Sequence, residues 1–276
     1  MKMLFSIFGI PIHFFGIMIA VGILAAIWVA GKEVKRKGLD LNKFYDLATY
    51  TIIAAIIGAR IFYIVFYRLS YYIENPIDIF KVYEGGLSVH GGIAGGLIVA
   101  IFYVKKHQID FWKYADAVIP GVILAQGIGR VGCDVFGKTM NQVYIWGVEY
   151  QGAIVHPVQL YEAILNYIVF YILWRKRKHV TYKGQLFVWY LILFSVNRGI
   201  VELFRYNPTV IGWLSISHVL SIVFIIFGLI LRKILKNRKD SESHEDVNGK
   251  EHPLKTLAML AILIVSSIIV FYYVQS

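Results

Sequence analysis

The sequence predicts an all-α polytopic integral membrane protein, a helical bundle of seven core transmembrane helices with an eighth at the C-terminus. Three observations predict this class. The 276 residues are 58% hydrophobic, with a mean hydropathy of +0.63. The apolar residues form long runs, and short basic clusters separate these runs. A net charge of +11 could indicate nucleic-acid binding, but basic residues distributed between apolar runs are typical of membrane topology, so we expect no nucleic-acid partner.

Eight stretches of the chain are long and apolar enough to cross a bilayer, for which a helix needs about 20 residues. Some contain polar interruptions, and the fourth and fifth are short. The stretches are residues 12–30, 45–67, 87–104, 114–128, 160–174, 185–205, 214–231 and 256–273. The connection between the fourth and fifth, residues 129–159, is too polar to lie in lipid. The sequence therefore predicts eight helices and one long polar connection.

Lysine and arginine residues orient the predicted bundle. Most of the 28 basic residues lie in loops on one side of the helices, and few lie on the other side. The basic loops are residues 32–43, 105–113, 175–183 and 232–255. Because basic loops remain in the cytoplasm, we expect the N-terminus and the 129–159 connection to lie outside.

The chain divides into three parts by composition. Residues 1–235 form the predicted seven-helix catalytic domain, and residues 236–255 are charged, without apolar periodicity, and typical of a flexible cytoplasmic linker. Residues 256–276 contain the additional transmembrane helix, which we expect to be an appendage outside the functional site. A single cysteine, Cys133, excludes an internal disulfide and provides no metal framework.

A histidine at the outer mouth of the third predicted helix is the most informative single residue. His90 lies among six glycines in residues 85–96, and a titratable ring in lipid is unfavourable unless it does chemistry or has a partner. An imidazole accepts a proton near neutral pH, so His90 is either a general base or a helix-terminal histidine with satisfied hydrogen bonds. The pairs Gly91/Gly95 and Gly92/Gly96 indicate close helix packing or, alternatively, a ligand cradle.

Charged residues within the predicted helices, or just past their outer ends, gather at one depth, near the outer surface. Each costs about 2.5–3.5 kcal/mol at the centre of a transmembrane helix, so a common depth indicates a common role. These residues are Arg60, Arg130, Glu162, Arg198, Glu202 and Arg205. The last three are spaced four and three residues apart and therefore share one helical face, where they could simply neutralise one another.

An Arg–Glu–Arg ladder still leaves one positive charge, and Arg60 and Arg130 add two more. Surplus cations that face the interior of a bundle require an anion, and the planar guanidinium group binds phosphate through two parallel hydrogen bonds. The anion expected at this depth is the phosphate of a membrane lipid.

Five segments in sequence resemble the prolipoprotein diacylglyceryl transferases. They are residues 58–63, 85–96, 129–132, 156–162 and 198–205. Their order and spacing match the family along about residues 10 to 231. The resemblance implies a multi-pass enzyme of the bacterial cytoplasmic (inner) membrane with its active site toward the outer leaflet. The implied reaction, the first step of lipoprotein maturation, moves the diacylglyceryl group of phosphatidylglycerol onto the lipobox cysteine thiol of prolipoprotein signal peptides and releases glycerol phosphate.

The resemblance also implies roles for individual residues. Arg130 and Arg198 would bind the phosphate, and His90 would be the base for the incoming thiol. Together with the charge argument, this predicts a larger set of substrate-binding residues. They are Arg60, Gly91, Gly92, Gly129, Glu162, Glu202 and Arg205. The expected partners are phosphatidylglycerol, prolipoproteins and membrane lipids, and the chemistry requires no metal and no cofactor.

Four positions depart from the family pattern. Phe15 stands where the family has a tyrosine, Cys133 where it commonly has asparagine, Lys138 where it usually has glutamate, and Asn141 where it has glycine. These departures keep a second hypothesis open, namely a catalytically altered paralogue that acts as a phospholipid-binding or regulatory membrane protein. A transporter is a third hypothesis, but it would need polar groups through both leaflets, and the inner halves of the predicted helices are nearly all apolar.

Overall fold

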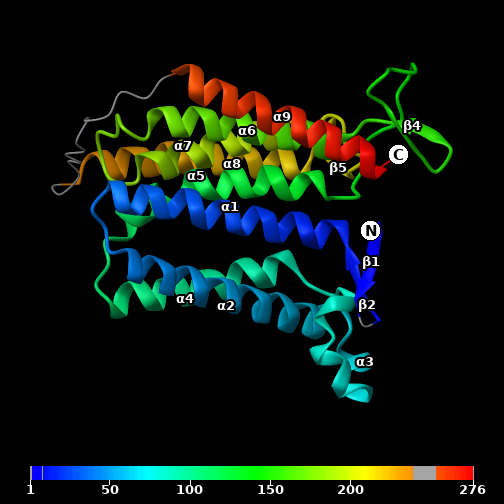
Figure 1. Cartoon of the computed structure of the whole chain (residues 1–276), viewed down its shortest axis with the longest axis horizontal. Helices are drawn as coiled ribbons and strands as arrows, with labels where there is room; N and C mark the ends of the chain where they lie inside the picture. Colours follow the sequence, from blue (N-terminus) through cyan, green and yellow to red (C-terminus); the bar gives the residue numbers. More distant parts are fainter. Residues whose placement is uncertain (1, 8, 239–252, 276) are drawn as a thin grey trace. The chain divides into compact units, whose positions relative to one another are not determined.

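The computed structural model describes residues 2–7, 9–238 and 253–275, most of which are helical (Figure 1). The chain forms two compact units. The smaller, here called the α2–α4 unit, comprises Met3–Ile12 and Val34–Tyr114, and the larger, the α5–α9 unit, comprises Met1–Lys2, His13–Glu33 and Ala115–Ser276. Each unit has its own internal packing.

Two long helices form the α2–α4 unit. Helix α2 (Leu41–Tyr67) begins where the Asp40 side chain accepts hydrogen bonds from the backbone N–H groups of Asn42 and Lys43, at 2.9 and 3.1 Å, which satisfies donors that a helix start leaves free. Helix α4 (Val89–Lys106) packs along it (Figure 1). The unit also contains strand β1 (Met3–Ile7), which pairs with β2 (Ile10–His13).

Glycines allow α2 and α4 to approach closely. A Cβ atom placed on Gly58 would lie 2.5 Å from the carbonyl oxygen of Gly91, and one placed on Gly95 would lie 2.5 Å from that of Ala54. A Cβ on Gly91 itself would collide with the Gly58 carbonyl. The close-packing interpretation of the Gly91/Gly95 pair is therefore confirmed.

Short helical segments connect α2 to α4. They are α3 (Leu69–Glu74), η1 (Pro76–Phe80) and η2 (Val82–Glu84). Gly85 and Gly86 follow with φ angles of 95° and 72°, a left-handed conformation that glycine adopts without steric strain. The connection ends at Ser88, the N-cap of α4.

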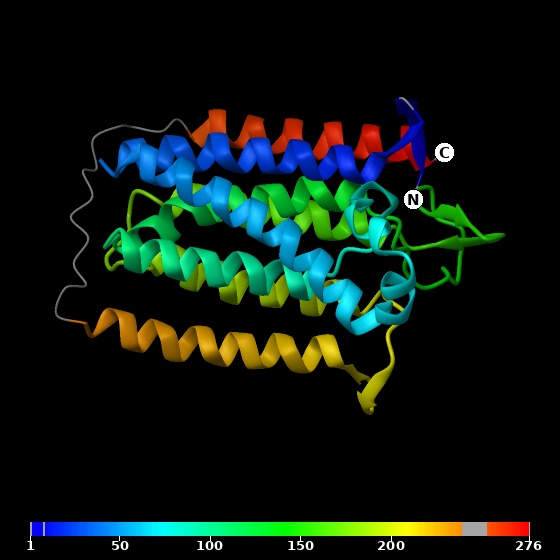
Figure 2. The same cartoon turned by 90° about the horizontal axis from the view of Figure 1, so that it is seen from below.

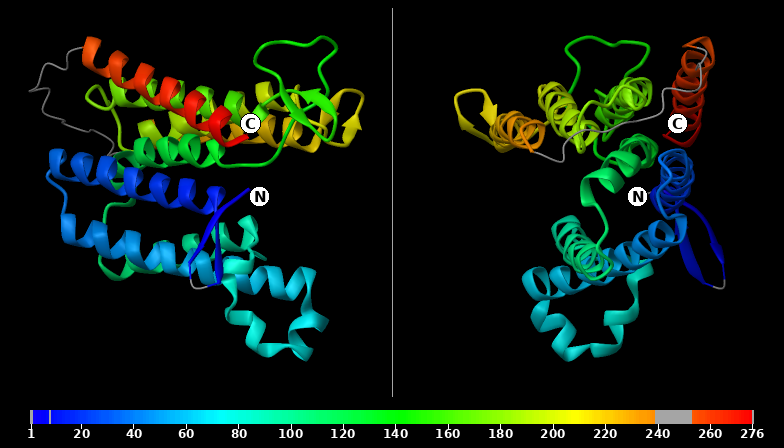
Figure 3. Two further views of the ribbon diagram at one scale, coloured as in Figure 1. Left: turned by 45° about the vertical axis from the view of Figure 1, so that its right-hand side comes forward. Right: turned by 90° about the vertical axis from the view of Figure 1, so that its left-hand side faces the viewer.

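The α5–α9 unit is a bundle of helices that run roughly parallel or antiparallel to one another (Figures 1 and 2). The end-on view on the right of Figure 3 looks along several of their axes. The helices are α1 (Phe14–Arg36), α5 (Phe111–Val131), α6 (Val158–Lys176), α7 (Gln185–Glu202), α8 (Ile216–Lys236) and α9 (Pro253–Gln275). Helix α7 packs against α6 and α8. Fully buried side chains such as Tyr167, Phe170 and Leu186 form the core.

Two hairpins extend the α5–α9 unit beyond its helices. Strand β3 (Val148–Tyr150) pairs antiparallel with β4 (Ala153–Val155), and β5 (Thr209–Ile211) pairs with β6 (Leu214–Ser215). The β3–β4 hairpin lies in the connection predicted to be too polar for lipid. The expectation of an all-α chain thus needs a correction, because backbone groups in these connections pair as short two-stranded sheets.

Two buried acidic residues hold the other end of this bundle together. Asp116 of α5 accepts hydrogen bonds from the N–H groups of Gly184 and Phe187, at 2.8 and 3.1 Å, and so caps the start of α7. Glu33 of α1 pairs with Arg177 at 2.6 Å. Arg177 lies in one of the loops used to predict orientation, yet the structure buries it, and its charge therefore also has a packing role.

Each of the eight predicted stretches largely coincides with one helix of the structure. Among the described residues, five helices are long and apolar enough to cross a membrane, namely α1, α2, α4, α8 and residues Leu254–Val274 of α9. Four boundaries were wrong. Residues 12–13 belong to β2, residues 87–88 precede α4, and residues 214–215 form β6. Helix α7 ends at Glu202 instead of residue 205, and Arg205 lies in the turn that follows. The greater part of the predicted linker, residues 239–252, lies outside the described residues.

Helix α9 is an integral part of the α5–α9 unit. It packs against α6, the Phe271 ring is fully buried, and the hydroxyl groups of Ser267 and Tyr167 form a buried hydrogen bond of 2.8 Å. The Tyr272 hydroxyl donates to the Trp146 carbonyl oxygen at 2.6 Å. The expectation that α9 is an appendage was therefore wrong. The buried hydroxyl of Tyr167 needs a hydrogen-bond partner, and Ser267 of α9 supplies it.

Candidate functional site

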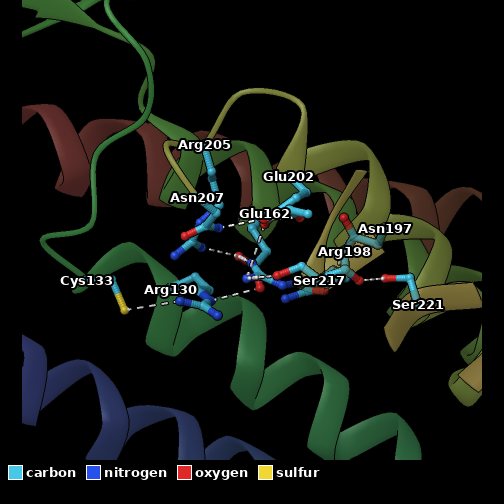
Figure 4. A network of polar contacts seen from close by, with 12 residues as sticks. Arg130, Cys133, Glu162, Asn197, Arg198, Glu202, Arg205, Asn207, Ser217 and Ser221 are labelled. Atoms are coloured by element: carbon cyan, nitrogen blue, oxygen red, sulfur yellow. Dashed lines mark hydrogen bonds and ion pairs between the residues drawn. The ribbon is translucent and has the colours of Figure 1, made fainter. Parts of the chain in front are cut away.

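Three arginines and two glutamates meet in the α5–α9 unit (Figure 4). We call this set the arginine cluster. Its members are Arg130, Glu162, Arg198, Glu202 and Arg205. Arg130 lies in the last turn of α5, where a cation complements the helix dipole. Glu162 lies near the start of α6, Arg198 and Glu202 in the last turns of α7, and Arg205 just beyond that helix.

Glu162 is the centre of the arginine cluster. One carboxylate oxygen lies 2.9 Å from Nε of Arg130, and the other lies 3.5 Å from Arg198 and 3.7 Å from Arg205. The Glu162 side chain is only 2% exposed, and a carboxylate so buried is stable only when it is paired. A single acidic residue therefore draws guanidinium groups from three different parts of the chain to one point.

Glu202 holds the cluster from the side of α7 and α8. Its carboxylate lies 3.4 Å from Arg198 and accepts hydrogen bonds of 2.6 Å from the Asn207 amide and from the Ser215 hydroxyl. Ser215 also caps the N-terminus of α8. The same carboxylate thus fixes Arg198, the turn after α7 and the start of α8 in one arrangement.

The cluster carries more positive than negative charge, and its positive groups are the more accessible ones. Three arginines face two glutamates. The arginine side chains are 30%, 23% and 14% exposed, in the order Arg130, Arg198 and Arg205, whereas both glutamates are at most 2% exposed. This distribution is suited to an anion that approaches from the open side of the guanidinium groups.

Free hydrogen-bond donors remain on these arginines. Arg130 directs Nε to Glu162 and Nη1 to the Cys133 sulfur, and its Nη2 has no hydrogen bond within the described part of the chain. Nη1 of Arg198 is buried and likewise lacks a hydrogen bond there, although it lies 3.5 Å from Glu162. Unused N–H groups beside a surplus charge are what a phosphate group requires.

The residues around Arg130 are closely packed. Gly129 lies against Ile19 of α1, and Gly132 lies against Phe15, whose Cα atom would be 3.0 Å from a Cβ placed on that glycine. The sulfur of Cys133 is 3.8 Å from Nη1 of Arg130. Burial raises the pKa of the Cys133 thiol, and the nearby Arg130 only partly offsets this, so the thiol is protonated at neutral pH.

The turn after α7 is held by the polar connection between α5 and α6. Lys138 donates from Nζ to the Leu203 carbonyl oxygen at 2.9 Å and from its backbone to that of Phe204 at 2.8 Å. These contacts place Arg205 beside Glu162 although α7 has ended. The sequence offered no signal for them, because they join residues that are far apart in the chain.

Asn141, which also departs from the family pattern, is exposed and has no hydrogen bond among the described residues.

His156 supports the start of α6. Its ring nitrogen Nδ1 lies 3.1 Å from the Tyr161 hydroxyl, and its backbone pairs with Gly137 and Lys138. Burial, together with the charge of Lys138, lowers the pKa of the imidazole. His156 thus supports the backbone just before α6, six residues before Glu162.

The remaining predicted site residues, His90, Arg60, Gly91 and Gly92, belong to the α2–α4 unit. His90 is the second residue of α4, and its exposed ring has no hydrogen bond among the described residues. The nearest ring is that of Phe62, with centroids 6.3 Å apart. Arg60 is buried, and each of its N–H groups faces a backbone carbonyl oxygen.

Comparison with known proteins points to one family. The family model described as prolipoprotein diacylglyceryl transferase matches residues 2–234. The chain is 36% identical over 247 residues to the phosphatidylglycerol–prolipoprotein diacylglyceryl transferase of Clostridioides difficile (strain 630), which covers 89% of this chain and 99% of that protein. Proteins of the same name from Bacillus cereus (strain G9842) and Bacillus cytotoxicus are 35% and 34% identical, over 83% and 84% of this chain and 89% and 90% of theirs.

Proposed function

The chain belongs to the prolipoprotein diacylglyceryl transferase family, and from this premise we propose that it transfers the diacylglyceryl group of phosphatidylglycerol to the cysteine thiol of prolipoproteins. The sulfur attacks the glyceryl carbon that carries the phosphate. A carbon–sulfur bond forms, the carbon–oxygen bond to phosphate breaks, and glycerol phosphate leaves. The thiol proton passes to a base on the enzyme.

The arginine cluster is the observation that carries this proposal. A departing phosphate gains negative charge in the transition state, and donors already in place stabilise that charge without reorganisation. Arg130 has an Nη2 group without a hydrogen bond among the described residues, and the Arg198 side chain is 23% exposed, so we assign these two arginines to the phosphate. Arg205 adds positive charge, while Glu162 and Glu202 hold the three guanidinium groups in place.

His90 is the residue we assign to the thiol. A thiol has a pKa of about 8.5 and is mostly protonated at neutral pH, so the reaction needs a base. The exposed ring of His90 has no competing hydrogen bond among the described residues, and it is therefore available to a substrate. Gly91 allows the backbones of α2 and α4 to approach closely. Gly92 lies against Ala55 and Gly129 against the Ile19 side chain, and we keep both as residues that border the substrate.

We further propose eight membrane spans, with the N-terminus outside and the arginine cluster in the outer leaflet of the bacterial cytoplasmic membrane. Five apolar helices support a multi-pass protein. Helices α5, α6 and α7 carry the buried carboxylates of Asp116, Glu162 and Glu202, and we assign these helices to the interior of the bundle, where polar groups are tolerated. In this organisation, residues 1–235 form the catalytic domain and residues 256–276 contain the last membrane span. Residues 236–255 form the cytoplasmic linker between them.

Purified protein in lipid nanodiscs containing phosphatidylglycerol, supplied with a lipobox peptide, tests the proposal by mass spectrometry of the thioether product. Arg130→Gln and His90→Ala should each lower the rate at least about 100-fold, as loss of a charge-stabilising donor or a general base does. Arg68→Gln, which changes an exposed arginine, is the matched control. Product formation that neither variant reduces would refute the assigned mechanism.

One observation favours a second candidate function. Cys133 occupies the place beside Arg130 where the family commonly has asparagine, and its protonated, half-buried sulfur is a poor partner for a phosphate or a hydroxyl group. A phospholipid-binding paralogue without turnover would bind phosphatidylglycerol and release no glycerol phosphate. The nanodisc assay separates the two functions, and Cys133→Asn should then restore transfer.

A further inference from the structure

Arg60 binds the connection between α2 and α4 through all five of its guanidinium N–H groups. The side chain leaves α2 and is 6% exposed. Its acceptors are backbone carbonyl oxygens of a single segment. They are those of Ile79 at 2.9 Å from Nε, Gly85 and Gly86 at 2.8 and 3.1 Å from Nη1, and Asp78 and Lys81 at 2.5 and 3.5 Å from Nη2. A guanidinium group has five N–H donors, so none is left for a ligand.

The segment is built around this guanidinium group. The Tyr72 ring lies 5.0 Å from Cζ of Arg60, within range of a cation–π contact. A Cβ atom on Gly86 would be 2.6 Å from Nη1 of Arg60, so only glycine fits there. The Asp78 carboxylate pairs with Lys81 at 2.6 Å. Arg60 does not bind this nearby carboxylate and donates to backbone carbonyl oxygens instead.

The segment that Arg60 holds leads directly to His90. Ser88 donates its backbone N–H to the Ala59 carbonyl oxygen at 3.0 Å, and α4 begins at the next residue. His90 has no side-chain hydrogen bond among the described residues, so the backbone before it sets the direction of its ring. A displacement of this backbone would move the imidazole, because its one ring contact among the described residues is with Phe62 of α2, at 6.3 Å between centroids, and no hydrogen bond holds the ring there.

We propose that Arg60 is a positioning residue that sets the location of His90 by clamping residues 78–86, and that it does not bind the lipid phosphate. This inference rests on the proposed function for the part that concerns catalysis. It replaces the substrate-binding role expected from the sequence, because the cation that seemed to need an anion is solvated by five carbonyl dipoles. The clamp itself is independent of the reaction.

Arg60→Lys and Arg60→Gln, with Arg68→Gln as the matched control, test the two roles by steady-state kinetics in nanodiscs. A clamp predicts that both variants lower kcat at least about tenfold, that KM for phosphatidylglycerol stays within about twofold, and that lysine does not rescue. Lysine supplies three donors from one atom and cannot span five carbonyl oxygens. A raised KM with unchanged kcat, or rescue by lysine, would show a phosphate ligand and overturn the proposal.

Hydrogen exchange measured by mass spectrometry tests the clamp without reference to activity. The amides of residues 78–92 should exchange at least about tenfold faster in Arg60→Gln than in the parent, while those of α7 stay unchanged. If Arg60→Gln does not fold, Gly86→Ala, which forces a Cβ atom against Arg60, should show the same local change. Unchanged exchange in residues 78–92 refutes the clamp, whereas faster exchange in a protein without transferase activity would refute only the proposed function.

Discussion

Neutralising Glu162 is the most direct test of the arginine cluster. Glu162→Gln keeps the shape of the side chain and removes the charge that three arginines share. At an effective dielectric constant of about 20, the separations of 2.9–3.7 Å correspond to a gross attraction of about 4–6 kcal/mol for each pair. Repulsion among the guanidinium groups and the desolvation of the carboxylate offset most of this sum.

The net effect follows from what the substitution leaves behind. Removing one partner of a buried ion pair typically costs about 3–5 kcal/mol, because the other charge remains uncompensated. The three arginines are 14–30% exposed, so water compensates part of this loss, and we expect about 3 kcal/mol. For a chain of this length that lowers the Tm by about 6 °C, measured by the thermal unfolding of purified protein in detergent.

Two comparisons make the expectation decisive. Glu149→Gln makes the same change at an exposed position of β3 and should alter the Tm by less than about 1 °C. Glu162→Gln combined with Arg205→Gln restores a surplus of one positive charge and should recover at least about 1 kcal/mol. A Tm of Glu162→Gln that matches the Glu149→Gln control, or strictly additive effects in the double variant, would refute the reasoning.

Three further perturbations have expected outcomes. Gly91→Ala should destabilise the protein by at least about 2 kcal/mol, because its Cβ collides with the Gly58 carbonyl, whereas Gly16→Ala, where space is open, should be neutral in the same thermal assay. Phe271→Ala should cost about 3–5 kcal/mol, because its ring is fully buried; a loss below about 1 kcal/mol would mean that α9 is a loose appendage. The rate of maleimide labelling of Cys133 should keep increasing with pH beyond the range in which an ordinary thiol deprotonates. Burial raises the pKa of this thiol, so the reactive thiolate forms only at higher pH. A labelling rate that reaches its plateau below pH 8 would contradict this expectation.

The approximate positions of the helices could be predicted from local pattern alone. Each apolar stretch largely coincides with a helix because transfer of apolar side chains from water depends on composition over about 20 residues, which can be read from the sequence. The convergence of Arg130, Arg198 and Arg205 was likewise expected, since Arg130 and Arg198 lie near the C-terminal ends of their helices and Arg205 follows α7 directly. The end of α7 was misplaced because a turn and a continuing helix differ little in their apolar pattern.

The partners of each charge could not be predicted in this way. Arg60 and Arg130 look alike in the sequence, yet one meets five carbonyl oxygens and the other meets Glu162 and Cys133. Lys138 stands where the family usually has glutamate, and in the structure its side chain supports the turn that carries Arg205. Composition gives the cost of a charge in a membrane, but only neighbours in space decide how that cost is offset.

The sequence by itself determined the class of the protein, the approximate position of its helices and the family to which it belongs. These properties depend on free energies that add along the chain. The tertiary structure alone decided that Glu162 organises three arginines, that Arg60 holds the segment before His90, and that α9 belongs to the packed core. Such contacts depend on how each helix is rotated and how closely it approaches its neighbours, and packing between distant segments sets both.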